Sequence, residues 1–499
     1  MPRDSFAVRT AVLRGVEAHP IVVEVSVSQG IPGVTIVGMA DTAVQEARHR
    51  VRCAVRECGF EWPRAHLTIN LSPSELRKTG TGFDLPIAVA ILACTNQIPT
   101  KDLDGCLFVG ELALFGGLNG VRGMVAFERL AYEQGLTLVA PGGSVATGGG
   151  DVRTIDVLAQ MAQGIQSLVP AQPFFTTTSI EEGSDAREDF ADVVDQDLAK
   201  RAFTIAAAGE HGLLMVGPPG AGKSMMAKRM PTILAPMDEQ ERAEALLIHS
   251  AAGQELEALL GGARPFRAPH HAISLGGMVG GGRPIRPGEA SLAHKGVLFL
   301  DELPEFGPSV LQALRQPMEE HEVRLVRVEG TYVFPSDFML VAAANPCPCG
   351  YLGDPDHACT CSAARIQTYQ SRIGGPLMDR IDVLVDVARP DSSRIIAGER
   401  GLSSKQMAEQ VSIARDFASW RREHKDDGKA DRTRTVPELD LDAQARAALE
   451  GIAKRLGLGG RNIVRIARVA RTIADLAESE TVHKDHVMEA CAYRTRATL

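Results

Sequence analysis

The pattern of apolar and polar positions differs between three parts of the chain. In residues 1–170, short runs with β-type alternation, such as 21–27 and 66–71, are separated by longer stretches with helical spacing, such as 42–58 and 84–94. Both periods within one stretch of this length predict a compact α+β domain over residues 1–170.

The central part, residues 190–392, contains three short runs that are apolar at every position: 213–216, 297–300 and 338–344. Such runs are typical of parallel strands that are buried on both faces. They end, in order, in a glycine-rich segment, two acids and an asparagine. Ligands of open α/β sheets bind beyond the carboxyl ends of the strands, so this pattern predicts an α/β domain with a site at one sheet edge.

The remaining residues, 393–499, have mostly helical spacing and predict a helical lid domain. Within this part, the charged stretch 421–432 is expected to be an exposed loop. Residues 171–189 are expected to form an acidic linker, because eight acids face one arginine between Glu181 and Asp197.

A long helix is expected over residues 454–471, with six cations and no acid. Arg461, Arg465 and Arg468 would share one face, and like charges at that spacing repel each other. An anion nearby is therefore expected: nucleotide phosphates for Arg461, and either DNA or acids of a neighbouring subunit for the other two.

The glycine-rich segment at 217–224 fits the pattern GxxxxGK[ST] between a strand and a helix, which is the context of a phosphate-binding P-loop. Its backbone N–H groups would converge on phosphate oxygens at a helix N-terminus. Lys223 would reach the β- and γ-phosphates, and the Ser224 hydroxyl would ligate Mg²⁺. The predicted nucleotide-binding residues are Gly217, Pro218, Pro219, Gly220, Ala221, Gly222, Lys223 and Ser224.

Three polar residues at the ends of the next strands predict hydrolysis of the nucleotide. Asp301 is expected to hold the Mg²⁺ shell, and Glu302 to polarise the attacking water. Asn345, the sensor 1 residue, would hydrogen-bond the water and the γ-phosphate. Two arginines complete the predicted catalytic set: Arg380 as an arginine finger, with Arg372 as its rival and a plain ion pair as the alternative, and Arg461 as sensor 2.

This ordered set resembles the AAA+ superfamily. The strings at 265–274, 286–306, 344–350 and 469–476 are similar to those of the YifB/ComM family of magnesium-chelatase-like ATPases, and the similarity covers nearly the whole chain. The resemblance implies ATP and Mg²⁺ as cofactors and a ring-forming, hexameric homo-oligomer. It also implies DNA as a partner, since ComM members are linked to DNA branch migration during natural transformation.

The N-terminal part resembles the Lon-protease C-terminal/ribosomal S5-like fold, mainly at 82–90 and 108–118. No serine stands at residues 82–84, where Lon proteases carry their nucleophile. Arg122 is the only cation where they carry their lysine, and arginine does not lose its proton in proteins. The resemblance therefore implies a domain without the proteolytic dyad.

Four cysteines lie within fifteen positions, directly after Asn345. Four thiols suit tetrahedral Zn²⁺, with His357 as a spare ligand and metal-free reduced thiols as the alternative. The predicted zinc ligands of this insertion are Cys347, Cys349, Cys359 and Cys361.

Residues 322–334 alternate polar and apolar side chains about Glu329-Gly330, which predicts a β-hairpin. Related AAA+ helicases project a hairpin from this point into the ring pore, where Arg324 and Arg327 would meet DNA phosphates. A solvated hairpin face is the alternative.

Composition sets the remaining limits. The net charge of −9 argues against a uniformly basic nucleic-acid coat but allows a local basic track. No long apolar run, no signal-like N-terminus and scattered cysteines predict a cytoplasmic protein that does not enter a membrane. The expected function is ATP-driven DNA remodelling, and the alternatives are a magnesium-chelatase motor subunit or a protein-remodelling ATPase.

Overall fold

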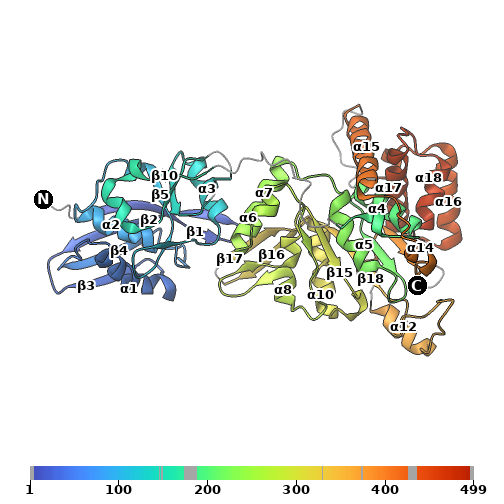
Figure 1. The fold of residues 1–499 in the computed structure, drawn as a ribbon, viewed down its shortest axis with the longest axis horizontal. Coiled ribbons are helices and arrows are strands. Elements are labelled where there is room, and N and C mark those ends of the chain that lie inside the picture. Colours follow the sequence, from blue (N-terminus) through green and yellow to red (C-terminus); the bar gives the residue numbers. More distant parts are fainter. Residues whose placement is uncertain are drawn as a thin grey trace.

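The computed structural model describes residues 5–144, 146–147, 150–172, 188–328, 330–372, 375–424 and 435–494. Figure 1 shows three regions in a row that follow the order of the sequence: a first sheet with helices in blue and teal, a second sheet with helices in green and yellow, and helices in orange and red. The mixed α/β class is confirmed. Most of the predicted acidic linker, residues 173–187, lies outside the described residues.

The N-terminal region is built on an eight-stranded sheet in the order β10-β9-β8-β5-β1-β2-β4-β3. Side chains of a strand alternate between its faces, so Val8 and Val12 enter one core while Ala11 enters another. Helices α1 and α2 supply the first core and α3 supplies the second. The bounds are β1 (Ser5–Arg14), β2 (Glu17–Ser28), β3 (Gly33–Val37), α1 (Thr42–Glu57), β4 (His66–Ser72), α2 (Asp84–Cys94), β5 (Cys106–Phe108), β6 (Glu111–Leu112), β7 (Leu118–Asn119), α3 (Met124–Glu133), β8 (Thr137–Pro141), β9 (Val152–Ile155) and β10 (Val169–Pro170).

The residue at the start of α2 has a structural role. Asp84 is buried, and Arg50 donates to its carboxylate from Nε at 2.6 Å and from Nη2 at 2.9 Å. Burial raises the pKa of Asp84, whereas the Arg50 guanidinium lowers it. A carboxylate held in this way joins α1 to α2.

The central region contains a wholly parallel five-stranded sheet in the order β12-β15-β18-β11-β19. The three apolar runs of the sequence therefore form neighbouring strands, with their carboxyl ends at one edge. Leu213 and Met215 face one core while Leu214 and Val216 face another. The bounds are α4 (Asp197–Gly209), β11 (Leu213–Val216), α5 (Lys223–Arg229), α6 (Glu239–Ala252), α7 (Glu257–Leu260), β12 (Phe266–Arg267), α8 (Leu275–Val279), β13 (Gly280–Gly281), β14 (Arg286–Pro287), α9 (Glu289–Leu292), β15 (Val297–Leu300), α10 (Pro308–Ala313), α11 (Arg315–Glu320), β16 (Glu322–Arg327), β17 (Gly330–Pro335), β18 (Met339–Ala344), α12 (Ala363–Ser371), α13 (Gly375–Met378) and β19 (Val383–Asp386).

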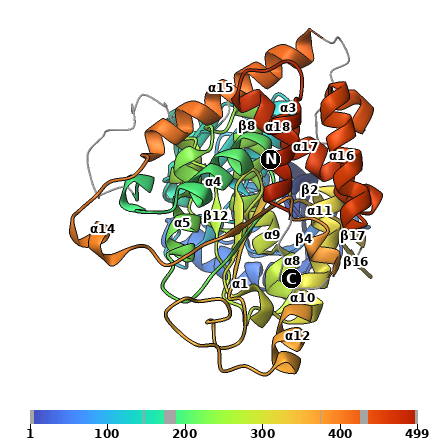
Figure 2. The same ribbon diagram turned by 90° about the vertical axis from the view of Figure 1, so that its right-hand side faces the viewer.

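The last region is helical, as expected, and Figure 2 shows its helices in orange and red. The predicted helix 454–471 is wrong. One helix ends at Leu456, Gly457 adopts a left-handed φ of 61°, and the next helix begins at Gly460. The bounds are α14 (Ser392–Ile396), α15 (Ser404–Glu423), α16 (Ala443–Leu456), α17 (Gly460–Leu476) and α18 (Lys484–Ala492).

The expected exposed loop at 421–432 is also wrong at its start. Arg421 lies in the last turn of α15 and is 2% exposed. Its Nε and Nη2 atoms each donate to the Asp475 carboxylate at 3.1 Å. Residues 425–432 of this prediction lie outside the described residues.

The N-terminal and central regions are in direct contact through α3 and α6. The backbone N–H of Gly123 donates to the Ser250 carbonyl at 2.9 Å, and that of Val125 donates to the Ser250 hydroxyl at 3.3 Å. Val125 also packs with Leu246 and Leu260 in a small apolar core. The two regions are therefore joined by buried apolar and polar contacts.

Candidate nucleotide site and four-cysteine loop

The predicted P-loop joins the end of β11 to the start of α5. Gly220 and Gly222 have φ angles of 80° and 83°, which residues other than glycine rarely adopt. Gly217 lies against the backbone of Val387, where a Cβ atom would collide. The turn therefore depends on glycine at these positions, and it leads directly into a helix N-terminus.

Lys223 lies over this loop. Its Nζ atom donates to the carbonyls of Gly217 at 2.7 Å and Pro218 at 2.9 Å, and to the side-chain oxygen of Asn345 at 3.1 Å. Burial lowers the pKa of Lys223 to about 8, although Asp301 and Glu302 oppose that shift. A phosphate group here would supply the anion that the buried ammonium lacks.

Ser224 and Asp301, the two predicted Mg²⁺ ligands, are in contact. The Ser224 hydroxyl donates to a carboxylate oxygen of Asp301 at 2.6 Å. Hydroxyl and carboxylate oxygens are the ligands that Mg²⁺ prefers, so this pair fits the ion. The contact joins the P-loop helix to the end of β15.

Glu302 follows directly and has a left-handed φ of 50°, so its side chain leaves the strand direction. The side chain is 56% exposed, and one carboxylate oxygen lies 3.6 Å from Nδ1 of His271. The His271 ring contacts two other rings, with centroids at 4.1 Å from His270 and 6.5 Å from Phe306. No sequence pattern predicts this histidine as a partner of Glu302, although it lies within one of the strings that carry the family resemblance.

Asn345 follows β18 and faces the P-loop through Lys223. Tyr369, a buried residue of α12, forms a hydrogen bond with the backbone of Asn345. Burial raises the pKa of Tyr369 to about 12, and the nearby acids Glu305 and Glu302 add to the shift. Tyr369 thus supports the residue predicted as sensor 1, and the sequence analysis did not single it out.

Arg380 lies at the opposite end of β11 from the P-loop. Its backbone carbonyl lies against Gly212, the residue before β11. A Cβ atom built on Gly212 would be 2.8 Å from that carbonyl oxygen. The guanidinium is 8% exposed and forms an ion pair with Glu319. Arg372, its rival, lies 3.6 Å from a carboxylate oxygen of Glu305.

Arg461 and Arg380 lie in the same part of the fold, because Arg494 donates both to the carbonyl of Ile381 and to the side chain of Asn462. Burial lowers the pKa of Arg380, and the nearby charges of Arg315, Arg465 and Arg461 lower it further. Arg465 is 3.5 Å from the Asp382 carboxylate, so its anion is an acid of the same chain, which differs from the two partners expected.

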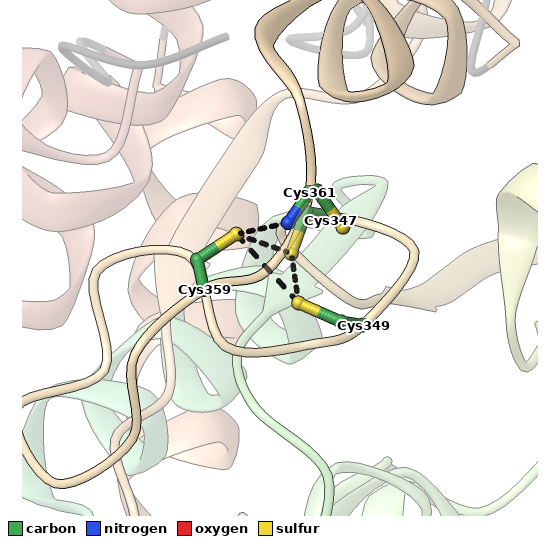
Figure 3. A group of neighbouring side chains, drawn as sticks. All are labelled: Cys347, Cys349, Cys359 and Cys361. Carbon is green, nitrogen blue, oxygen red and sulfur yellow. Dashed lines mark hydrogen bonds between the residues drawn. The ribbon is translucent and has the colours of Figure 1, made fainter.

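The four predicted zinc ligands lie together in the loop after β18 (Figure 3). The Sγ atom of Cys347 is 3.3 Å from that of Cys349 and 3.7 Å from that of Cys359, and all four sulfurs lie within 4.8 Å of one another. A tetrahedron with Zn–S bonds of about 2.3 Å places its sulfurs about 3.8 Å apart, so the group fits Zn²⁺.

His357, the spare ligand of the sequence analysis, belongs to a neighbouring cluster. Its Nδ1 atom lies 2.9 Å from a guanidinium nitrogen of Arg389 and 3.5 Å from the Asp354 carboxylate. Its ring stacks on Tyr351 with centroids 5.0 Å apart. It is not among the four residues whose ligand atoms converge.

The cysteine loop touches the P-loop. A Cβ atom at Gly350 would meet the Pro219 ring at 2.5 Å, so the two loops are packed against each other there. The Gln370 side chain donates to the Pro346 carbonyl at 3.2 Å and joins the loop to α12. The cysteine group is therefore in direct contact with the candidate nucleotide site.

The predicted hairpin is confirmed as β16 paired antiparallel with β17, with Arg327 opposite Gly330. Its turn residue Glu329 lies outside the described residues. Arg324 forms an ion pair with Glu322 at 2.5 Å, and the Arg327 side chain is exposed.

Comparison with known proteins identifies the family. Three family models match: "Magnesium chelatase, subunit ChlI" over residues 189–395, "Subunit ChlI of Mg-chelatase" over 23–143, and "Magnesium chelatase, subunit ChlI C-terminal" over 401–494. No helix among the described residues is long and apolar enough to cross a membrane.

Two of the similar proteins match nearly the whole chain, and a third matches part of it. YifB of Escherichia coli is 38% identical over 98% of this chain and 96% of its own. The competence protein ComM of Haemophilus influenzae is 38% identical over 97% of this chain and 96% of its own. The magnesium-chelatase 67 kDa subunit of Chlorobaculum tepidum is 31% identical over 32% of this chain and 23% of its own. The chain therefore belongs to the YifB/ComM family of magnesium-chelatase-like AAA ATPases.

Proposed function

We propose that the protein hydrolyses ATP at the P-loop and couples hydrolysis to the remodelling of DNA. The observation that carries the ATPase assignment is the meeting of Lys223, Ser224, Asp301 and Asn345 at one edge of the parallel sheet. Groups with these charges at a helix N-terminus are what a magnesium nucleotide requires.

The residues have distinct roles in this proposal. Lys223 binds the β- and γ-phosphates, and Ser224 and Asp301 would hold Mg²⁺, which supplies charge neutralisation between the phosphates. Glu302 accepts the proton of the attacking water, and Asn345 orients that water. His271, in contact with Glu302, would hold that carboxylate in place.

The location of Arg380 favours a role in an oligomer. Arg380 and Arg461 lie toward the beginning of β11, whereas the P-loop follows its end. We propose that both arginines serve the nucleotide of an adjacent copy of the chain, within a hexameric ring. An arginine supplied in trans stabilises charge in the transition state.

We propose that the four cysteines hold one structural Zn²⁺. Thiolates would fill all four coordination positions of the ion, as in structural zinc sites, which have no open position for water or substrate. The ion would therefore not take part in hydrolysis. Its effect on the nucleotide site would be transmitted by the contact between Gly350 and Pro219.

DNA is the proposed substrate because the exposed hairpin β16–β17 carries Arg324 and Arg327. The relative named a competence protein agrees with this choice. The alternative, a chelatase motor, is favoured by the descriptions of the matched family models, including the one that covers residues 23–143. The N-terminal region consequently does not decide between the two.

The deciding experiment measures ATP turnover with single-stranded, forked and four-way DNA at low salt. A DNA motor is expected to respond to at least one of these DNAs, and the Arg324→Gln/Arg327→Gln variant is expected to lose most of the response. A chelatase motor is expected to ignore DNA and respond only to a partner protein. DNA without effect on turnover, together with no DNA binding, would reject the proposed substrate.

A further inference from the structure

We propose that the N-terminal region contributes directly to DNA binding, through an arginine track that crosses from it to the two hairpins of the ATPase region. The proposal rests on the proposed action on DNA. The track consists of Arg14, Arg122, Arg283, Arg286 and Arg327.

The first step of the track joins the N-terminal region to the β16–β17 hairpin. Arg14 ends β1, and its guanidinium carbon lies 5.3 Å from the ring centroid of Tyr332 in β17. The Arg14 side chain also lies against Gly330, where a Cβ atom would collide with it. Figure 1 shows β1 leading toward this hairpin. Arg14 is thus held near the turn end of the hairpin.

The second step lies on the contact between α3 and α6. Arg122 stands two residues before α3, and its Cδ atom would be 3.0 Å from a Cβ atom at Gly253, the residue after α6. Burial lowers the pKa of Arg122, and the charge of Arg286 lowers it further. Arg122 touches the end of α6, and α6 packs on β14, the strand that carries Arg286.

The third step connects these two points. Arg286 in β14 pairs with Gly281 in β13, and a Cβ atom at Gly281 would lie 3.8 Å from Nη2 of Arg327. Arg283, in the turn between β13 and β14, is exposed. The arginines thus follow one another from Arg122 through the two hairpins to Arg327, whose strand partner Gly330 lies against Arg14.

Four arginines of this track lack an acid partner among the described residues, since no ion pair there includes Arg122, Arg283, Arg286 or Arg327. Glu322, the acid at the start of β16, is paired with Arg324. The chain as a whole has a net charge of −9, so this concentration of cations is local. An external anion would relieve the repulsion between them.

The form of the track favours a nucleic-acid backbone over a small anion. Its guanidinium groups extend over four separate parts of the fold instead of converging on one point, which suits phosphates repeated along a strand. The hairpin also exposes Val326 and Val328, at 68% and 107% of their reference areas. Apolar side chains beside cations suit the bases and sugars of DNA.

The test uses the full-length protein and fluorescently labelled single-stranded and forked DNA. Binding is measured by anisotropy at several salt concentrations for the wild type, Arg14→Gln/Arg122→Gln and Arg14→Lys/Arg122→Lys. The matched control is Arg52→Gln/Arg56→Gln, which removes two exposed arginines from α1. The midpoint of thermal unfolding checks that each variant is folded.

The glutamine variant is expected to bind DNA about 10-fold more weakly at low salt. Its slope of log K against log salt should be smaller by about 1.4 to 1.8, because each lost phosphate contact removes about 0.7 to 0.9. The lysine variant should retain the wild-type slope, and the Arg52/Arg56 control should match the wild type in affinity and slope.

Other outcomes separate the two levels of the proposal. If the wild type binds DNA and the folded glutamine variant keeps its affinity and slope, the N-terminal contribution is rejected while the DNA function stands. If the wild type does not bind DNA at low salt, both are rejected. If polyglutamate displaces DNA as well as unlabelled DNA does, the track binds acidic protein surfaces instead, and the inference is overturned.

Discussion

Lys223 donates a hydrogen bond to the side-chain oxygen of Asn345 at 3.1 Å, and so connects the P-loop to the end of β18. The same ammonium donates to two carbonyls of the loop itself. The three oxygens that accept from this buried ammonium among the described residues are all neutral. This explains why its pKa is lowered while Asp301 and Glu302 lie nearby.

The lowered pKa predicts a pH dependence of nucleotide binding. Lys223 has a pKa of about 8 instead of its ordinary 10.5, and bound phosphates favour its charged form. The affinity for ATP should therefore be constant below about pH 7.5 and fall as the pH rises above about 8. Calorimetry at pH 8.5 in buffers of different ionisation enthalpy should detect proton uptake on binding.

The control for this prediction is Lys223→Arg, because arginine keeps its charge at every pH of the experiment. Any remaining pH dependence in that variant belongs to other groups. Proton uptake that is the same in the wild type and in Lys223→Arg would contradict the assignment to Lys223. In the free protein, the sign of the effect on stability is opposite: stability should rise between pH 8 and 10.5, since the unfolded chain binds more protons there.

Glu302→Gln should bind ATP with nearly unchanged affinity and hydrolyse it about 100-fold or more slowly. The amide keeps the size of the side chain but cannot accept the proton of the water, and general-base catalysis contributes roughly 10² to 10⁴. Lys223→Ala, in contrast, should remove nucleotide binding itself. Equilibrium binding and single-turnover hydrolysis separate the two effects. A Glu302→Gln protein with wild-type turnover would show that another group activates the water.

The parts of this site that the sequence predicted are those with local signals. Glycines at fixed spacing indicate the P-loop, because few other structures require that spacing. Strands that are apolar at every position indicate a buried parallel sheet, and so place the acids that follow them at its edge. The contact between His271 and Glu302 has no such signal, since the two residues are brought together only when β15 and the preceding segment are placed in space.

The errors have physical causes as well. Helical spacing of arginines continued across 454–471, yet the glycines at 457, 459 and 460 are a stop signal, and Gly457 takes the left-handed conformation that ends α16. The charged neighbours of Arg421 in the sequence predict an exposed loop. Its partner Asp475 lies in another helix, and a buried charge becomes favourable only with such a partner.

Arg380→Ala should leave ATP affinity nearly intact and reduce hydrolysis by about 100-fold or more, because a finger acts on the transition state. Mixing this variant with Glu302→Gln should restore part of the activity. In a mixed ring, a subunit with an intact Glu302 can receive Arg380 from its neighbour. The measurement is ATP turnover across a series of mixing ratios.

The ion pair with Glu319 offers the matched control for Arg380. Glu319→Gln breaks the pair within the chain and keeps the arginine, so it should retain most of the turnover. If Glu319→Gln is as inactive as Arg380→Ala, and no mixture regains activity, Arg380 serves the fold of its own chain and is not a finger.

The four-cysteine loop should carry about one zinc per chain in protein purified without added metal. Cys349→Ser is expected to lose the metal, whereas Cys53→Ser, which removes an exposed thiol outside the group, should keep it. Because Gly350 packs on Pro219, loss of the metal should also weaken ATP binding while the N-terminal region stays folded. Elemental analysis and ATP titration measure the two effects. Wild-type protein with almost no zinc and four freely titratable thiols at these positions would reject the zinc site. Loss of zinc without any change in ATP affinity would show that the metal stabilises only its own loop.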